Sequence, residues 1–352
     1  GSRYEASPYV VPFLFEVLDA SQFPLQRQLI DLLLGLAVGC GESFLPYGYN
    51  LETEERRFKD KSWGSLFDYD NAGSAYYEVH QHAEVFTRFL RPECHPESRL
   101  SAGFAVAHFA QSLSQYHADV SRYIAKESDE SQLQNLMLCF GMLGRYADVK
   151  PDVRILTDYL EPACSPTLRV SAAIAVTTIR GSETPDPALK TLLSALVESW
   201  TLESPRDDWR WWNEGDLLGY AALVLRLVGK GHRDEFAFVL CKALEKTEAC
   251  TFAVPQTLLD ILFPDPKPPA GRNVADFDDV QRHCLGTLLQ TRHWRDWMIS
   301  SKFLPSGLTG DDYRNALQKF VSGITGDMNA SDSNLLWRAG NVSSWDLKKH
   351  WP

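Results

Sequence analysis

The segment best equipped for chemistry is DDWRWWNE, residues 207–214, which places three tryptophans within four positions among acidic side chains. Tryptophan faces attract cations and carboxylates add negative charge, so the segment is suited to a cationic group or a basic partner. It is also suited to core packing, with tryptophans between helices and acids beginning the next helix. The sequence leaves open a ligand cage, a partner-binding patch and a piece of core. The candidate residues are Asp207, Asp208, Trp209, Trp211, Trp212 and Glu214.

A second aromatic and charged segment, residues 41–72, reads GESFLPYGYNLETEERRFKDKSWGSLFDYDNA and interrupts an otherwise helical pattern. Segments of this length without regular structure are usually functional or disordered. We therefore add Trp63, Tyr69 and Asp70 to the candidate ligand-binding or partner-binding residues.

Metal-binding patterns are weak. Residues 68–73, DYDNAG, begin like a calcium loop, but the twelfth position of that loop requires glutamate and is Val79 here. We expect instead a turn in which Asp70 or Ser74 caps the following helix. His80 and His82 would lie about 200° apart around a helix, so they cannot share one metal ion. The sequence therefore predicts no metal site.

Catalytic signatures are absent from the sequence. It contains no G-x-S-x-G elbow, no phosphate-binding G-x-x-x-x-G-K, no H-E-x-x-H and no C-x-x-C. These absences favour a non-catalytic protein without a cofactor. A catalytic site assembled from distant residues would leave no such motif, so the question of enzymatic activity stays open.

The charge balance constrains the partners. The formal net charge is −11, whereas nucleic acids and anionic membranes bind mainly through basic residues. The longest apolar run, residues 30–38, is interrupted by Asp31 and Gly35 and is too short to span a bilayer. We expect a protein partner, of basic character, and neither nucleic acid nor a membrane.

The seven cysteines are scattered and form no C-x-x-C pair. They are typical of small buried apolar residues in a reducing compartment. We expect a cytoplasmic, intracellular protein. Gly1-Ser2 resembles the dipeptide that remains after an expression tag is cleaved. A targeting signal removed from the natural N-terminus is compatible with the sequence.

Apolar residues recur at helical spacing along most of the chain, and no convincing alternating strand is present. Short turns between these stretches indicate antiparallel helix pairs. The predicted helices are residues 7–20, 24–38, 74–91, 97–111, 113–126, 130–144, 151–160, 166–179, 186–201, 214–228, 232–246, 253–263, 276–290 and 311–322.

Internal similarity is the strongest signal for the fold. Residues 99–106, RLSAGFAV, match residues 169–176, RVSAAIAV, at an offset of 70 positions. Residues 134–140 occupy the middle position in a degenerate form, and residues 24–37, which contain Arg27, form an earlier copy. Periods of this size are typical of helical repeat arrays.

The repeated segment has a physical interpretation. Small residues such as Gly103 and Ala175 would let neighbouring helices approach closely, while Phe104 and Ile174 would fill the space between units. The arginine in the first helical turn is unfavourable for the helix dipole. We expect it to bond carbonyls or an acidic residue of the adjacent turn, and so to tie one unit to the next.

This pattern of Pro or Ser, then Arg, then small residues in the second helix of each pair resembles the HEAT repeat. It is similar to bacterial-style HEAT families, which include phycobilin-lyase-type repeats and proteins of uncharacterised function. Residues 69–90, 97–109 and 279–285 carry further resemblance, which covers residues 7–290 in all. It implies an all-α, right-handed superhelix, an armadillo-like α-solenoid, and says little of function.

The organisation expected is a repeat array over residues 3–262 with the insert at 41–72. A Pro-rich spacer at 263–275 and a C-terminal helical cap and tail at 276–352 would follow. The leading hypothesis for function is a non-catalytic scaffold or adaptor that binds a protein partner on the concave face. The oligomeric state is left open.

The alternative hypothesis is an enzyme or small-molecule binder with an aromatic-acid pocket around 207–214 for a cationic ligand. HEAT-like DNA glycosylases also use tryptophan and aspartate, and Trp209, Trp211 and Asp208 are of the same residue types. Those enzymes line their groove with basic residues, and no helix rich in lysine or arginine occurs here. For a bilin lyase, no distinctive residue can be placed on this chain.

Overall fold

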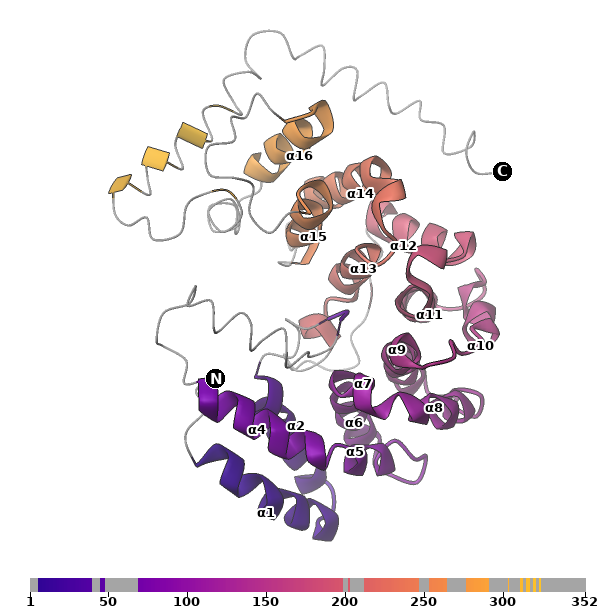
Figure 1. Cartoon of the computed structure of the whole chain (residues 1–352). Coiled ribbons are helices and arrows are strands. Elements are labelled where there is room, and N and C mark those ends of the chain that lie inside the picture. Colours follow the sequence, from indigo (N-terminus) through magenta and orange to yellow (C-terminus); the bar gives the residue numbers. More distant parts are fainter. Residues whose placement is uncertain are drawn as a thin grey trace. The chain divides into compact units, whose positions relative to one another are not determined.

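The computed structural model describes residues 6–39, 45–47, 69–198, 202, 212–246, 253–264 and 277–290, with scattered positions between 303 and 323. Every regular element among these residues is helical (Figure 1), so the predicted all-α class is confirmed. Within the same residues, none of the helices has the length and apolar character needed to cross a bilayer.

The chain divides into two compact units. The first, the N-terminal unit, comprises residues 1–232 and 249–257, and the C-terminal unit comprises 233–248 and 258–352. The division expected from sequence at residue 262 lies inside the C-terminal unit.

The N-terminal unit is a succession of helix pairs whose bounds lie close to those predicted. The pairs are α1 (Ser7–Ala20) with α2 (Leu25–Val38); α4 (Tyr69–Gln81) and α5 (Glu84–Arg88) with α6 (Pro96–His108); α7 (Ala110–Leu113), η2 (Ser114–Tyr116) and α8 (His117–Ile124) with α9 (Glu130–Tyr146); α10 (Arg154–Thr157) and η3 (Asp158–Leu160) with α11 (Pro166–Arg180); and η4 (Gly181–Glu183) and α12 (Asp186–Glu198) with η5 (Trp212–Gly215), α13 (Leu217–Leu225) and η6 (Lys230–His232).

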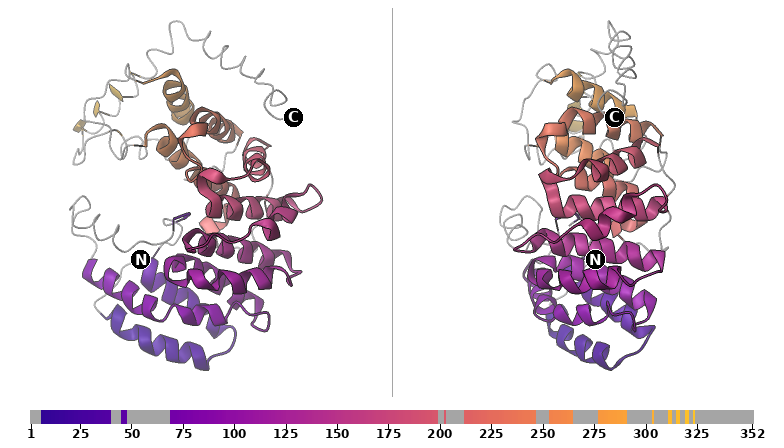
Figure 2. Two further views of the ribbon diagram at one scale, coloured as in Figure 1. Left: turned by 45° about the vertical axis from the view of Figure 1, so that its right-hand side comes forward. Right: turned by 90° about the vertical axis from the view of Figure 1, so that its right-hand side faces the viewer.

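The second helix of each pair packs on the second helix of the next. Contacts run from α2 to α6, from α6 to α9, from α9 to α11 and from α11 to α13 (Figures 1 and 2). The first helices α8 and α10 cover one side of this layer. Because α9 is enclosed by neighbours, every residue from Gln132 to Gly144 is buried.

The 70-residue similarity extends into the turns that precede α6 and α11. Both turns read Leu-x-Pro-x-Cys-x-Pro, at 90–96 and 160–166. The Cys94 thiol donates to the carbonyl of Arg88 at 3.6 Å, and the Cys164 thiol donates to that of Asp158 at 3.8 Å. Each helix then begins with proline, which suits the first helical position. The same turn is therefore built twice.

Small residues allow the second helices to approach one another, as the sequence predicts. A Cβ atom added to Gly141 of α9 would lie 2.8 Å from the Ala175 Cα of α11, closer than side chains tolerate. One added to Gly103 of α6 would lie 2.3 Å from the Asn135 side chain of α9. The spacing of the helices therefore requires glycine at position 141, while a side chain at position 103 would displace the Asn135 amide.

Two of the repeated arginines, Arg27 and Arg99, connect successive helix pairs, which confirms for these two the role predicted from the sequence. Arg27 Nη1 of α2 bonds Glu97 Oε2 of α6 at 2.6 Å. Arg99 Nη2 of α6 bonds Glu127 Oε2, in the turn before α9, at 2.5 Å. The second ion pair is buried on both sides. Each carboxylate belongs to the helix pair that comes next along the chain after the helix pair of its arginine.

Burial of the Glu127 carboxyl would by itself raise its pKa. Hydrogen bonds from the backbone N–H groups of Asp129 and Ser128, and the guanidinium of Arg99, more than offset this and hold the pKa below its ordinary value. The carboxylate is therefore stabilised in its charged form.

The N-caps predicted at Asp70 and Ser74 are wrong. Helix α4 begins at Tyr69, so both residues lie inside the helix and the stretch after Asp68 is not a loop. Glycine at 73 costs helix stability by about 1 kcal/mol. The packing of α4 against α1 and α2, with Ala75 and Val79 fully buried, offsets that cost.

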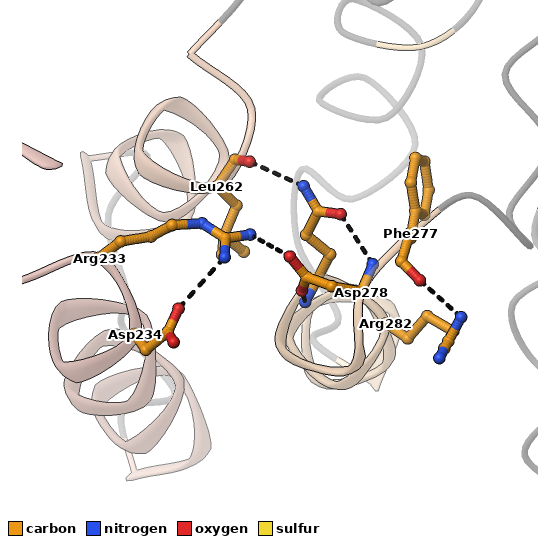
Figure 3. A network of polar contacts seen from close by, with 7 residues as sticks. Arg233, Asp234, Leu262, Phe277, Asp278 and Arg282 are labelled. Carbon is orange, nitrogen blue, oxygen red and sulfur yellow. Dashed lines mark hydrogen bonds and ion pairs between the residues drawn. The ribbon is translucent and has the colours of Figure 1, made fainter.

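In the C-terminal unit, α14 (Arg233–Lys246) packs against α16 (Asp279–Gln290). Asp278 and Gln281 form a reciprocal capping box, with N–H to side-chain distances of 2.8 and 3.0 Å. Arg233 Nη2 donates to Asp278 Oδ2 at 2.8 Å, and Gln281 Nε2 donates to the Leu262 carbonyl at 3.0 Å (Figure 3). Through these bonds the start of α16 is fixed to α14 and to the end of α15 (Ala253–Leu262).

Candidate binding surface

Trp212 is the part of the aromatic-acidic segment that the structure describes most fully, and its side chain is completely buried. Its indole N–H donates to Asn135 Oδ1 of α9 at 3.2 Å. The Asn135 amide in turn donates to the Arg99 carbonyl of α6 at 3.1 Å. The ring packs edge-on against Phe104, with 5.3 Å between centroids, and parallel to Tyr220, with 6.0 Å. Trp212 thus joins α6, α9 and α13.

The turn that follows Trp212 is held by its own hydrogen bonds. Asn213 adopts a positive φ of 49°, a conformation that asparagine tolerates better than most residues. Its amide donates to the Asp216 carbonyl at 2.9 Å, and the Asp216 carboxylate caps α13 by accepting from the Gly219 N–H at 2.9 Å. The C-terminal end of the 207–214 segment is therefore fixed in place.

A second element, residues 45–47, is fixed on the same layer of helices. Two guanidinium groups lie over the Tyr47 ring: Arg145 Cζ from the end of α9 is 5.2 Å from the ring centroid and Arg226 Cζ from the C-cap of α13 is 5.1 Å from it. The Tyr146 hydroxyl donates to the Tyr47 carbonyl. Cation–π contacts of this kind stabilise by about 0.5–1 kcal/mol each at exposed sites.

Both fixed elements lie on one side of the second helices. Figures 1 and 2 show η5 and residues 45–47 on the side of α9 turned away from α8 and α10. We call this side of α6, α9, α11 and α13 the second-helix face. Within the described residues, Tyr47 of the insert 41–72 and Trp212 of the segment 207–214 contact this face.

Basic side chains gather at the C-terminal ends of α9 and α11. Burial and the charges of Arg145 and Arg180 lower the pKa of Lys150. The Lys150 ammonium donates to the carbonyls of Gly144 and Arg145, and Arg180 donates to that of Pro151 at 3.3 Å. These cations therefore complement the negative ends of the helix dipoles.

Two buried titratable groups beneath this face, Cys139 and Tyr220, are neutral at pH 7. Burial raises the pKa of the Cys139 thiol and of the Tyr220 phenol. Neither group is thus poised as a nucleophile or a base. Among the described residues, no three His, Cys, Asp or Glu side chains lie close enough together to hold a metal ion.

The remaining predicted site residues are placed only in part. Tyr69 and Asp70 lie in the first turn of α4, and Glu214 lies in η5. The structure describes the backbone at these three positions and not their side chains. Trp63, Asp207, Asp208, Trp209 and Trp211 lie outside the described residues.

Sequence reasoning did not select Asn135, Tyr47, Arg145 or Arg226. Asn135 lies 77 positions from Trp212, and Tyr47 lies 99 positions from Tyr146. An asparagine inside a predicted apolar helix was the available signal, because a buried amide requires a hydrogen-bond partner.

No family model, curated protein or solved structure matches this chain. The interpretation of the second-helix face therefore depends on its own geometry and charge.

Proposed function

We propose that the N-terminal unit is a HEAT-like α-solenoid and that its second-helix face is the concave, partner-binding face of the array. The stepwise packing of α2, α6, α9, α11 and α13 supports this proposal. So do the turn built twice at a 70-residue interval and the arginines that connect successive pairs. Units of this kind bury their faces by stacking.

The proposed function is a non-catalytic scaffold that binds a protein partner on this face. The observation that carries the proposal is the anchoring of Trp212 through Asn135 to α6 and α9. The buried Trp212 fixes one point of a segment that is rich in aromatic and acidic residues. Trp209 and Trp211 belong to the residue type most enriched where binding energy is concentrated.

The charge of the chain supports a basic partner. The net charge is −11, and Asp207 and Asp208 place two carboxyl groups next to Trp209 in the sequence. In this proposal Arg145 and Arg226 hold Tyr47 in place rather than contacting the partner, because both guanidinium groups already lie over its ring.

Affinity capture from an extract of the native cells tests the proposal. The baits are the unmodified chain, the double variant Trp209→Ala/Trp211→Ala, and Tyr77→Ala, which removes an exposed aromatic side chain of α4. Circular dichroism and thermal unfolding verify that each bait is folded. We expect a basic protein to be retained by the unmodified chain and by Tyr77→Ala, and to be lost from the double variant.

The captured protein is then purified and titrated against the chain at rising salt concentration. Affinity that falls with salt would support electrostatic complementarity. Equal capture by the double variant would contradict the proposed surface. Co-purification of a small molecule with the unmodified chain, and of no protein, would contradict the scaffold function.

A further inference from the structure

The outer face of α1 is apolar and open to solvent. Tyr9 is 75% exposed, Val10 41%, Phe13 63% and Val17 46%. Ala6 and Ala20, at the two ends of the helix, are exposed as well. Large exposed apolar patches are uncommon on soluble monomers and mark interaction sites.

Helical geometry places these residues together. At 100° per residue, positions 6, 9, 10, 13, 17 and 20 fall within an arc of about 100°, which contains no polar residue. The other side of α1 is used within the N-terminal unit, where Val11, Phe15 and Leu18 are buried. Phe15 packs against Phe86, with 5.6 Å between ring centroids. Both sides of this helix are therefore apolar, and one of them is covered.

Helix α1 stands at an end of the stack. α2 and α4 pack against one side of it, and Figure 1 shows no described helix on the other side. The terminal units of a stacked helical protein normally present a polar outer face, which keeps them soluble. Here the outer face of the first described helix has the composition of an interior one.

We propose that a second copy of this chain covers the outer face of α1, in a two-fold symmetric dimer in which the two α1 helices pack antiparallel. The two-fold axis passes through Phe13. Each Tyr9 then faces Val17 of the partner subunit, and the two Phe13 rings meet on the axis. Ala6 likewise faces Ala20 of the partner subunit. Positions 6, 9, 13, 17 and 20 are symmetric about Phe13, so each of these apolar residues meets an apolar residue of the partner subunit.

Charge favours the antiparallel arrangement. The acidic residues of α1 are Glu16 and Asp19, both in its C-terminal half, while its first turn has no acidic residue and no side-chain cap. In the antiparallel pair the Glu16 carboxylate, which borders the apolar arc, approaches the first turn of the other helix, which carries the positive end of the dipole. Asp19 lies on the other side of α1, where it pairs with Arg88 at 3.5 Å. A parallel pair would place like charges together. The proposal does not depend on the function proposed for the second-helix face.

Sedimentation equilibrium of the full chain over a wide concentration range tests the dimer. We expect a reversible transition between 39.7 kDa and twice that mass. Phe13→Asp places two carboxylates on the axis and should weaken dimerisation by about 100-fold or more, because like charges oppose each other directly. The matched control is Val149→Asp, at a side chain that is 80% exposed outside α1, and it should dimerise like the unmodified chain.

A cysteine variant tests the position of the axis. Phe13→Cys should form a disulfide-linked dimer under mild oxidation, while the unmodified chain, which keeps its native cysteines, should not. A chain that stays monomeric at every concentration would overturn the proposal. So would association that continues beyond two copies, or dimerisation unchanged in Phe13→Asp. Because Phe13 is largely exposed, these substitutions should leave the fold intact, which circular dichroism verifies.

Discussion

Trp212 and the outer face of α1 place aromatic residues in opposite environments. The Trp212 ring is completely buried between Phe104 and Tyr220, and its N–H is bonded to Asn135. Tyr9 and Phe13, by contrast, have most of their surface in water. In sequence both regions are clusters of aromatic residues, and the acidic setting of Trp212 gives it the more surface-like appearance.

The difference shows that position in the stack decides burial more than composition does. Trp212 precedes a helix that packs on α11 and lies over α6 and α9, so it has neighbours on every side. Helix α1 is terminal, so one of its two apolar sides has none among the described helices. A buried tryptophan with a bonded N–H stabilises the fold, whereas an open apolar stripe is available for association.

The substitution Trp212→Ala tests the burial of this ring and should have the largest effect on stability. Truncating a buried tryptophan costs about 3–5 kcal/mol, and here it also leaves Asn135 Oδ1 without its donor. We expect the free energy of unfolding, measured by urea titration, to fall by that amount. Trp212→Phe keeps most of the packing and should cost less. A loss below 1 kcal/mol for the alanine variant would show that the ring is not a core residue.

Arg99→Met tests the ion pair beneath the same network. Removing one partner of a buried pair costs about 3 kcal/mol or more, because the other charge stays buried. The matched variant Arg27→Met breaks a half-exposed pair and should cost about 0–1 kcal/mol. Equal losses in the two variants would contradict the difference in burial.

The Arg99–Glu127 pair also predicts a pH dependence. The folded pKa of Glu127 is lowered from 4.5, so the pair stabilises fully above that value and its contribution is lost as pH falls through the folded pKa. Between about pH 6 and pH 3, the unfolding free energy of Arg99→Met should therefore fall less steeply than that of the unmodified chain. Parallel curves would show that Glu127 contributes nothing to the acid response.

Gly141→Ala tests the spacing of α9 and α11. The added methyl would meet the Ala175 backbone at 2.8 Å, and overpacking of this kind costs about 1–3 kcal/mol. The gain in helix propensity, about 1 kcal/mol, offsets part of it. We expect a net loss of stability of about 1 kcal/mol, while Gly231→Ala, where a methyl meets nothing within 4 Å, should be nearly neutral. A gain for Gly141→Ala would contradict the close approach.

Phe13→Ala should have the smallest effect on the free energy of unfolding, in contrast to Trp212→Ala. Its side chain is mostly in water, so the unfolding free energy measured at low protein concentration should change by less than about 0.5 kcal/mol. A loss close to that of Trp212→Ala would mean that the outer face of α1 is packed within one copy of the chain.

Much of the fold could be predicted from the sequence. Helix positions followed from apolar spacing, and the role of Arg99 followed from its unfavourable place in a helix dipole. These features are local or recur at a fixed interval. The start of α4 was missed because its cost at Gly73 is offset by contacts with α1 and α2, which a local pattern does not contain.

The candidate site could be predicted only in part. The sequence identified the 207–214 segment, but it could not distinguish Trp212 from Trp209 and Trp211, because the distinction depends on Asn135, 77 positions away. The cation–π contacts of Tyr47 are equally non-local, since Arg145 and Arg226 come from the ends of α9 and α13. The apolar spacing of α1 predicts two covered sides and contains no sign that one is open.

The central claim is that a protein partner binds beside the anchored Trp212, and photo-crosslinking tests it most directly. A photoreactive phenylalanine analogue is introduced at position 209 in one variant and at the exposed Val149 in another, and each is irradiated in native-cell extract. The account predicts a discrete adduct with one basic protein at position 209 and none with that protein at 149. The same protein crosslinked from 149 alone, or no adduct from either position, would contradict it.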